Sequence, residues 1–383
     1  MDRRLWLALN GAPGIGPVRF HRILKAFGSL DKAVGAGATG LAGKVSGIDA
    51  AQAGSVLRWI EEFDVEREIG LMRGLDARAV FFDDPDYPRN LLPLYDPPPV
   101  LYVRGALPDE GLRCIAVVGT RTPTPYGLRS CHDLVLGLAE AGLGIVSGLA
   151  KGIDTAAHGA ALEAGAPTFA VLGSGLNALY PAENKGLADR ISAEGGGLIS
   201  QFPLDATPDK RRFPMRNGVI SGLSAAVLVV EGEEDSGSLI TAEWALNQGR
   251  DIFAVPGPVD SRFSRGPNRL IQQGAKLVLD AADVMSEFPD FVPKAPLPRV
   301  KARAQADPSA AQVGLFEEPK RAPEDLNGEE MRIFQELRRS GRCAMDTLAQ
   351  KTGTSPAELS ATLTMLEIKG AIRQLPGTLV EAL

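Results

Sequence analysis

The middle of this chain alternates short apolar segments with stretches of helical pattern, and this alternation constrains the fold more than any other feature of the sequence. The apolar segments, many of them β-branched, are Ile115–Val118, Gly144–Ser147, Thr168–Leu172, Leu198–Ser200, Val227–Val230 and Asp251–Val255. Strands that are apolar on both faces are covered by helices on both faces, as in a parallel sheet. The sequence therefore predicts an α/β core that binds ligands at the carboxyl ends of its strands.

The composition changes on either side of this core and divides the chain into four parts. Residues 1–75 are helical in pattern, and residues 76–290 contain the alternating segments. Residues 291–325 are rich in proline, alanine and charged residues without a sustained period, which is typical of a linker. Residues 326–383 return to a helical pattern, so we expect a further folded unit there.

This last unit has the pattern of a winged helix. After a first helix at Met331–Leu337, a turn at Gly353 leads into a second helix at Pro356–Lys369, and a hairpin is expected around Gly370. Winged helices often place the second helix in the major groove of DNA. Here that helix carries two glutamates and a single lysine, so DNA contact, protein contact and simple packing all stay open.

The N-terminal part contains a tight turn, Gly14-Ile15-Gly16-Pro17, followed by a helical pattern. The turn resembles a helix-hairpin-helix motif, whose glycines let backbone N–H groups approach a phosphate. An ordinary turn in a small bundle explains the same residues, and the second half of the motif, at residues 47–49, is weak. We expect a helical domain of the helix-hairpin-helix or SAM-like kind, with both readings of its turn open.

Charge and cysteine content narrow the class of protein further. The formal net charge of −6 argues against coating duplex DNA through bulk charge but leaves room for a local basic groove. The three cysteines are far apart, without paired spacing for zinc, which suits a reducing compartment. No apolar run approaches the ~20 residues of a membrane span, and the N-terminus shows no convincing signal-peptide pattern. We expect a cytoplasmic protein without a metal site.

Small residues follow several of the predicted strands, where the backbone turns toward a helix. Backbone N–H groups at a helix N-terminus attract anions. The predicted anion-binding residues are Gly119, Thr120, Ser147, Gly148, Gly173, Gly175, Gly237, Ser238 and Thr241. In two of these loops a basic side chain, Arg121 or Lys151, can contact a phosphate directly. Asp154 stands where a helix N-cap is expected.

The same loops do not match a site for a nucleotide cofactor or for catalysis. Gly173–Ala178 is only a loose G-x-G-x-x-A, without the acidic residue that a dinucleotide site places after a following strand. There is no G-x-x-x-x-G-K-[ST] motif, and no histidine lies near a G-x-S-x-G. Asp154 and His158 lack a third metal ligand, so a helix cap and a packed histidine are predicted instead. We expect no cofactor.

A short segment before the fifth apolar stretch concentrates basic residues around one aromatic ring. The basic residues are Lys210, Arg211, Arg212 and Arg216, and the ring is Phe213. Cations that neutralise phosphates, beside a ring on which a base can stack, are what single-stranded nucleic acid binding requires. The alternative is a solvated basic loop.

Taken together, these segments resemble the DNA-processing protein A family, also called DprA or Smf. The resemblance is carried by VVGTRTPTPYG, SGLAKGIDTAAHGAAL, VLGSGLNALYPAEN, FPMRNGVISGLS and GSLITAEWALNQGRDIFAVPG, followed by GPNRLIQQGAKLV. These motifs cover most of residues 115–280. The resemblance implies an extended Rossmann-like core that binds single-stranded DNA, and the flanking helical and winged-helix parts also fit some family members.

The resemblance further implies a mediator that loads the RecA recombinase on incoming DNA in natural transformation, acting as a homodimer without known catalytic turnover. Carried over by motif, the DNA-binding positions are Arg121, Lys210, Phe213, Arg216 and Asn217. Two positions depart from the family pattern, which usually has glutamate at Gln201 and arginine at Gly218. The missing arginine puts one phosphate contact in doubt, for which Arg211 and Arg212 can compensate.

A nucleotide-processing enzyme is the alternative from another class. Phosphoribohydrolases that activate cytokinins have a similar core and show a P-G-G-x-G-T-x-x-E run. The corresponding loop here reads EGEEDSGSLITAE, which lacks Pro-Gly-Gly although Glu243 stands near the expected helix start. The sequence therefore favours the mediator.

Overall fold

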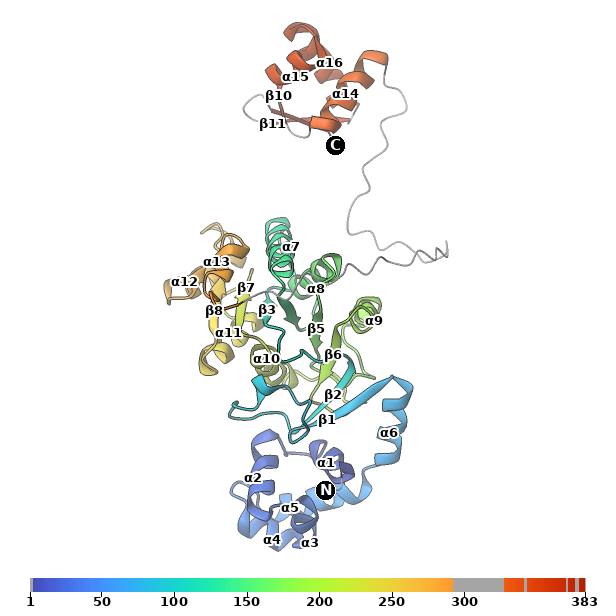
Figure 1. Cartoon of the computed structure of the whole chain (residues 1–383), viewed down its shortest axis with the longest axis vertical. Coiled ribbons are helices and arrows are strands. Elements are labelled where there is room, and N and C mark those ends of the chain that lie inside the picture. Colours follow the sequence, from blue (N-terminus) through green and yellow to red (C-terminus); the bar gives the residue numbers. More distant parts are fainter. Residues whose placement is uncertain (1–2, 292–326, 341–342, 370, 376–378, 383) are drawn as a thin grey trace. The chain divides into compact units, whose positions relative to one another are not determined.

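The computed structural model describes residues 3–291, 327–340, 343–369, 371–375 and 379–382 of the 383-residue chain (Figure 1). It contains two compact units, one within Met1–Lys301 and the other within Ala302–Leu383. Apart from Phe291, the linker expected at residues 291–325 lies outside the described residues.

The first unit is built on a nine-stranded sheet with the order β1-β2-β6-β5-β4-β3-β7-β8-β9. The strands are β1 (Ala77–Phe81), β2 (Val100–Gly105), β3 (Cys114–Val118), β4 (Gly144–Ser147), β5 (Thr168–Val171), β6 (Gly197–Ser200), β7 (Ala226–Val229), β8 (Asp251–Ala254) and β9 (Lys276–Leu277). All six predicted strands form, and from β6 to β9 every neighbouring pair is parallel. The predicted parallel sheet is extended at one edge by β2 and β1, and β2 runs antiparallel to both β6 and β1.

Helices cover both faces of this sheet, as the apolar strands predict. They are α7 (Pro125–Glu140), α8 (Ile153–Glu163), α9 (Lys185–Ala193), α10 (Arg212–Gly222), α11 (Gly237–Asn247), α12 (Arg265–Gln272) and α13 (Ala281–Met285). In β3, Ile115 and Val117 pack with residues of α7, α8 and α13, whereas Ala116 and Val118 pack with residues of α10 and α11. Fully burying a valine or isoleucine side chain contributes about 1.5–3 kcal/mol. Both faces of β3 therefore stabilise the core.

The N-terminal part of the same unit is a bundle of short helices. They are α1 (Arg3–Asn10), α2 (Pro17–Phe27), α3 (Leu30–Gly35), α4 (Gly37–Lys44), α5 (Ala50–Glu62) and α6 (Val65–Gly74). Trp6, Phe20 and Ile23 form the centre of its core. The turn at Gly14 leads into α2 with Pro17 as its first residue, where a missing N–H costs nothing, and Asp49 caps α5 by accepting from the backbone N–H of Gln52.

The bundle is fastened to the sheet through the loop that follows β6. Glu68 of α6 accepts a hydrogen bond from the backbone N–H of Leu204 (2.8 Å), and Asn10 of α1 donates to the carbonyl of Gln201 (3.0 Å). Burial raises the pKa of the Glu68 carboxyl. Arg67 pairs with Asp205 at 2.5 Å in the same loop. The start of this loop is therefore held by the helical bundle.

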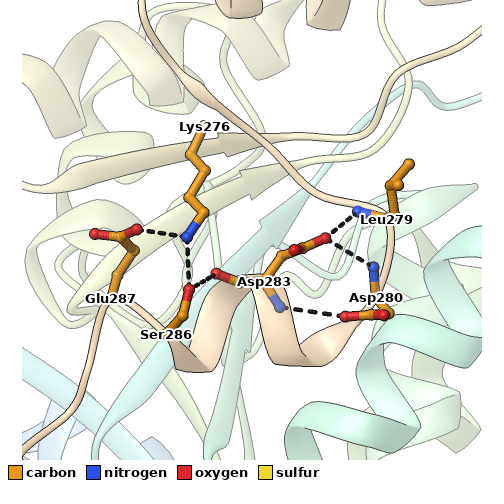
Figure 2. A network of polar contacts seen from close by, with 6 residues as sticks. All are labelled: Lys276, Leu279, Asp280, Asp283, Ser286 and Glu287. Atoms are coloured by element: carbon orange, nitrogen blue, oxygen red, sulfur yellow. Dashed lines mark hydrogen bonds and ion pairs between the residues drawn. The ribbon is translucent and has the colours of Figure 1, made fainter.

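A polar network joins the edge strand β9 to the residues that follow it, near the last described residues of this unit (Figure 2). Asp280 and Asp283 form a capping box at the start of α13, and the Asp283 carboxylate also accepts from the backbone N–H of Leu279 (2.8 Å). These backbone hydrogen bonds lower the pKa of Asp283. Lys276 of β9 reaches Ser286 and Glu287 at 2.6 and 2.5 Å. The network fixes the chain directly after the edge strand.

The second unit has the winged-helix arrangement. Its elements are α14 (Gly328–Ser340), β10 (Cys343–Ala344), α15 (Met345–Thr352), α16 (Pro356–Ile368), β11 (Ile372–Leu375) and β12 (Leu379–Ala382), with strand order β10-β12-β11. Gly353 has a φ of +67°, the left-handed conformation that a turn between two helices favours. The hairpin was expected around Gly370, which lies outside the described residues; the pairing strands are β11 and β12, so the wing comes later in the chain.

Candidate nucleic-acid interface

The loops predicted to bind anions lie side by side at the carboxyl ends of the central strands. They follow β3, β4, β5 and β7, which are parallel neighbours in the sheet. Strand order reverses direction at β3, because β4 lies on one side of it and β7 on the other. Such a switch point is where open α/β sheets bind ligands.

The loop after β3 is already occupied by an internal carboxylate. Glu231, which follows β7 and is 2% exposed, accepts from the backbone N–H of Thr124 (2.9 Å) and from its hydroxyl (2.6 Å). Helix α7 begins only at Pro125, so Arg121 lies in the preceding loop and not at the helix N-terminus as expected. A Cβ on Gly119 would come within 2.6 Å of Ile153, so this glycine allows loop packing. The placement argues against Gly119 and Thr120 as an anion cradle.

The loop after β4 is occupied in the same way. Asp154 accepts from the backbone N–H groups of Gly148 (3.0 Å) and Ala150 (3.3 Å). It is therefore not the helix N-cap that the sequence predicted: Gly152 caps α8, and the Asp154 carboxylate turns back into the loop. Ser147 donates to the carbonyl of Val117 and is fully buried. These donors and acceptors are hydrogen-bonded to one another, so few N–H groups are left to bind an external anion.

Arg216 lies beneath this loop and is buried, which places it away from the surface position predicted for a DNA contact. Its Nη1 donates to the carbonyl of Val171 (2.8 Å), and the side chain is 5% exposed. A Cβ on Gly148 would lie 1.7 Å from Arg216 Nη1, so only glycine fits above the guanidinium. Burial lowers the pKa of Arg216 to about 10, opposed by the nearby Asp154 carboxylate, so the arginine stays protonated at neutral pH. Arg216 acts as an internal counter-ion of the loops.

His158 belongs to the same buried region. Its Nδ1 lies 2.7 Å from Thr168 Oγ1, and that hydroxyl donates to the carbonyl of Ile145. The histidine Nδ1–H therefore donates, and burial lowers the pKa of His158 to about 3. No group of three or more His, Cys, Asp or Glu that could hold a metal ion occurs in the described part of the chain.

In the loop after β5, both predicted glycines serve internal packing. A Cβ on Gly173 would come within 2.6 Å of the Phe213 ring, and one on Gly175 within 2.1 Å of the carbonyl oxygens of Pro203 and Leu204. At the start of α11, Ser238 and Thr241 are 7% and 1% exposed. The loop after β5 therefore does not present the backbone surface that the sequence predicted for an anion, whereas Gly237 at the start of α11 is exposed.

Asn217 and Gly218, the last positions of the predicted basic segment, face α11. Asn217 donates to the carbonyl of Gly237 (3.1 Å) and is 8% exposed, so it joins α10 to α11 instead of reaching solvent. A Cβ on Gly218 would lie 3.2 Å from the indole of Trp244. The tryptophan thus covers the position at which the family resemblance implies an arginine. At the other departure, Gln201, the backbone carbonyl receives the hydrogen bond from Asn10.

Of the predicted site residues, those that stay accessible lie around Phe213, at the start of α10. The guanidinium of Arg121 lies 5.5 Å from the centre of the Phe213 ring, within the range of a cation–π contact, and that of Arg216 lies at 5.9 Å. Tyr180 lies beside the ring at 6.2 Å and is 47% exposed. Sequence reasoning missed Tyr180; its signal is an aromatic residue within the glycine loop that follows β5.

The predicted basic residues differ in how far their charges are already paired within the protein. Arg121 and Lys210 are exposed and form no ion pair among the described residues. Arg211 pairs with Asp209 at 2.9 Å, and Lys151 pairs with Glu183 at 2.6 Å. Arg212 donates to the carbonyl of Thr207 and lies over the Phe202 ring. Arg121 and Lys210 are thus the cations most available to a phosphate.

The fold and this surface define a Rossmann-like α/β protein with a basic and aromatic surface at its strand ends. A family model for DNA recombination-mediator protein A matches residues 78–289, and one for the DprA winged helix domain matches residues 317–378. Protein Smf from Synechocystis sp. is 32% identical over 98% of this chain and 98% of its own length. The chain belongs to the DNA recombination-mediator protein A family.

Two solved structures are similar to this chain. The X-ray structure of DNA processing protein A from Streptococcus pneumoniae is 35% identical, with a TM-score of 0.64, over 74% of this chain and 97% of that one. A structure concerned with the single-stranded DNA binding mode of DNA processing protein A from Helicobacter pylori is 28% identical, with a TM-score of 0.50, over 56% of this chain and 98% of that one.

Replacing Arg121 by alanine tests whether the exposed guanidinium binds a phosphate. We expect weaker binding of single-stranded oligonucleotides of every sequence, and a salt dependence whose slope falls by about 0.7–1, because one phosphate contact is lost. Arg190→Ala is the matched control, since it removes a cation that pairs with Glu194 on α9. Equal slopes for the two folded variants would contradict the phosphate role.

Replacing Phe213 by alanine tests the ring as a stacking platform. Single-strand affinity should fall by about 1–3 kcal/mol with little change in salt slope, because no charge is lost. Phe213→Tyr keeps a ring at this position and should retain most of the affinity. Binding and thermal melting are measured on the same samples. If the alanine variant binds normally but melts far lower, the ring serves packing alone.

Proposed function

We propose that this chain is a cytoplasmic single-stranded DNA-binding recombination mediator, which loads RecA recombinase on incoming DNA in natural transformation. Its binding surface comprises Phe213 with Arg121 and Lys210, and the proposal includes no catalytic turnover. The observation that carries it is the partly exposed ring of Phe213 with the exposed Arg121 guanidinium beside it. The ring can stack on a base while the guanidinium binds the backbone phosphate.

The internal carboxylates support a nucleic acid over a mononucleotide as the ligand. Glu231 and Asp154 take backbone N–H groups that would otherwise hold a nucleotide's phosphates. Recognition is then left to side chains on the surface, which suits a long strand bound without sequence preference. Glu243, the residue that kept the enzyme alternative open, is exposed on α11 and lines a groove facing α12, away from Phe213's contacts with Gly173 and Arg121.

We also propose that the protein forms a homodimer through the later part of the core. The edge strand β9 has no neighbour beyond it in the sheet of the described residues. A groove of about 780 Å³ lies between α11 and α12. Leu246 on α11 and Leu279 after β9 are 69% and 73% exposed. An open sheet edge flanked by exposed apolar side chains is a surface that favours pairing with another chain.

The mediator role is tested by RecA assembly on single strands already coated with single-strand-binding protein. We expect this chain to shorten the lag before RecA filaments form, and Arg121→Ala to lose most of that effect. Single-stranded oligonucleotides should also bind at least about tenfold tighter than duplex of equal length, a difference of ~1.4 kcal/mol. Equal affinity for the two, or an unchanged lag, would contradict the proposal.

No helix in the described ranges is long and apolar enough to cross a membrane.

Light scattering tests the proposed dimer. The pair of substitutions Leu246→Asp and Leu279→Asp should give folded monomers, because dimerisation would bury unpaired carboxylates. Tyr95→Asp is the control, since Tyr95 is 83% exposed but lies outside this region. A chain ending at Phe291 should still form dimers and bind single strands. Loss of either property in the shortened chain would show that residues 292–383 are required for it.

A further inference from the structure

The helical bundle carries a cluster of basic side chains that the Phe213 surface does not use. The cluster comprises Arg19, Arg22 and Lys25 of α2 together with Lys44 at the end of α4. Residues 14–58 contain six basic side chains and only two acidic ones, namely Arg19, Arg22, Lys25, Lys32, Lys44 and Arg58 against Asp31 and Asp49. This region is therefore locally positive in a chain whose formal net charge is −6.

The two arginines converge on the turns that precede α2 and α5. Arg19 donates to the carbonyl of Gly14 (2.6 Å), and Arg22 donates to the carbonyl of Ser46 (3.2 Å). A Cβ on Gly47 would lie 3.6 Å from Arg22 Nη1 and 3.7 Å from Arg19 Nε. Both guanidinium groups thus sit beside the same glycine turn, with donors left over for a further acceptor.

None of the four cluster side chains forms an ion pair among the described residues. Elsewhere on this unit, exposed arginines commonly have a carboxylate partner, as in Arg78–Asp86, Arg89–Glu110 and Arg190–Glu194. Lys44 makes only a cation–π contact, 5.2 Å from the Phe27 ring. The two arginines bind neutral carbonyls, so no carboxylate of the described residues pairs with these charges and their mutual repulsion is uncompensated. An anionic partner would offset it.

The turn that carries Gly14 adjoins the loop leading to the Phe213 surface. A Cβ on Gly11 would lie 3.1 Å from Pro203, and Asn10 donates to the carbonyl of Gln201. The loop continues from Pro203 to Lys210, and α10 then begins at Arg212. The basic cluster and the Phe213 surface therefore belong to one compact unit and are joined through one short loop.

We propose that Arg22, Lys25 and Lys44, with Arg19 behind them, form a second contact for the phosphodiester backbone of a single strand held at Phe213. This inference rests on the proposed function. The cluster has four cations, and the ring beside them, Phe27, is partly buried and packs against Lys44, so we assign phosphates to this cluster and not bases. Gly14 and Gly47 have φ values of +75° and +85°, which glycine adopts without strain, and their turns hold the two guanidinium groups close together.

The test compares short and long oligothymidylates on the triple variant Arg22→Gln/Lys25→Gln/Lys44→Gln. Arg19 is kept because it holds the Gly14 carbonyl. A short oligonucleotide of about 6 residues fills one binding surface, and one of about 40 residues reaches both, given site sizes of ~4–16 nucleotides per module. For the long strand, the salt slope should fall by about 2, at ~0.7 per lost phosphate contact. Binding of the short strand should not change.

The matched control removes the same number of charges from paired positions, as Arg78→Gln/Arg89→Gln/Arg190→Gln. Circular dichroism melting confirms that both triple variants are folded. Equal long-strand slopes for the two variants would overturn the second contact while leaving the proposed function intact. A loss confined to duplex binding, or a loss equal for short and long strands, would also overturn it. Failure of the wild-type chain to bind either strand would instead show that the proposed function is wrong.

Discussion

The structure depends on two buried carboxylates at the strand ends of the sheet. Glu231 holds the start of α7, and Asp154 holds the loop between β4 and α8, each by accepting from backbone N–H groups. A buried carboxylate is costly unless hydrogen bonds and a counter-charge compensate it. The backbone N–H groups supply the hydrogen bonds, and Arg216 supplies the positive charge near Asp154. The glycines that surround these groups follow from this arrangement, because no side chain fits above the Arg216 guanidinium.

This internal compensation changes how the strand ends can bind a ligand. In many α/β proteins the backbone N–H groups after the first strand hold a phosphate. Here the protein's own carboxylates take that place, so an anionic ligand must be held by side chains on the surface. Side-chain cations at a solvent-exposed surface bind phosphates in a salt-dependent way and discriminate little between sequences. That behaviour suits the proposed binding of a strand of any sequence.

Sequence reasoning found the elements whose signal is local. The six strands from Ile115 to Val255 are mostly apolar, and burial on both faces explains why they were recognised. Strand β1 was missed because it lies at the sheet edge and its second residue, Arg78, is an exposed arginine. Strand β9 contains only two residues, too few to form a pattern.

The candidate site was predictable only in part, because its decisive contacts join residues far apart in the chain. Nothing near Thr124 indicates that Glu231 will cap it from 107 residues away. Arg216 was grouped with its basic neighbours, although its spacing to Val219 and Ile220 places it on the inward face of α10. That helical spacing is the signal that separates an internal arginine from a surface one, and it was available in the sequence.

The fastening of the β6 loop to the helical bundle has a thermodynamic consequence for binding. Loops that become ordered only when a ligand arrives spend part of the interaction free energy on lost conformational entropy. Asn10, Glu68 and Arg67 already hold this loop at Gln201, Leu204 and Asp205. The segment that leads to Phe213 is thus preorganised by a domain that makes no contact with the ring, and the bundle contributes to affinity by restricting the unbound state.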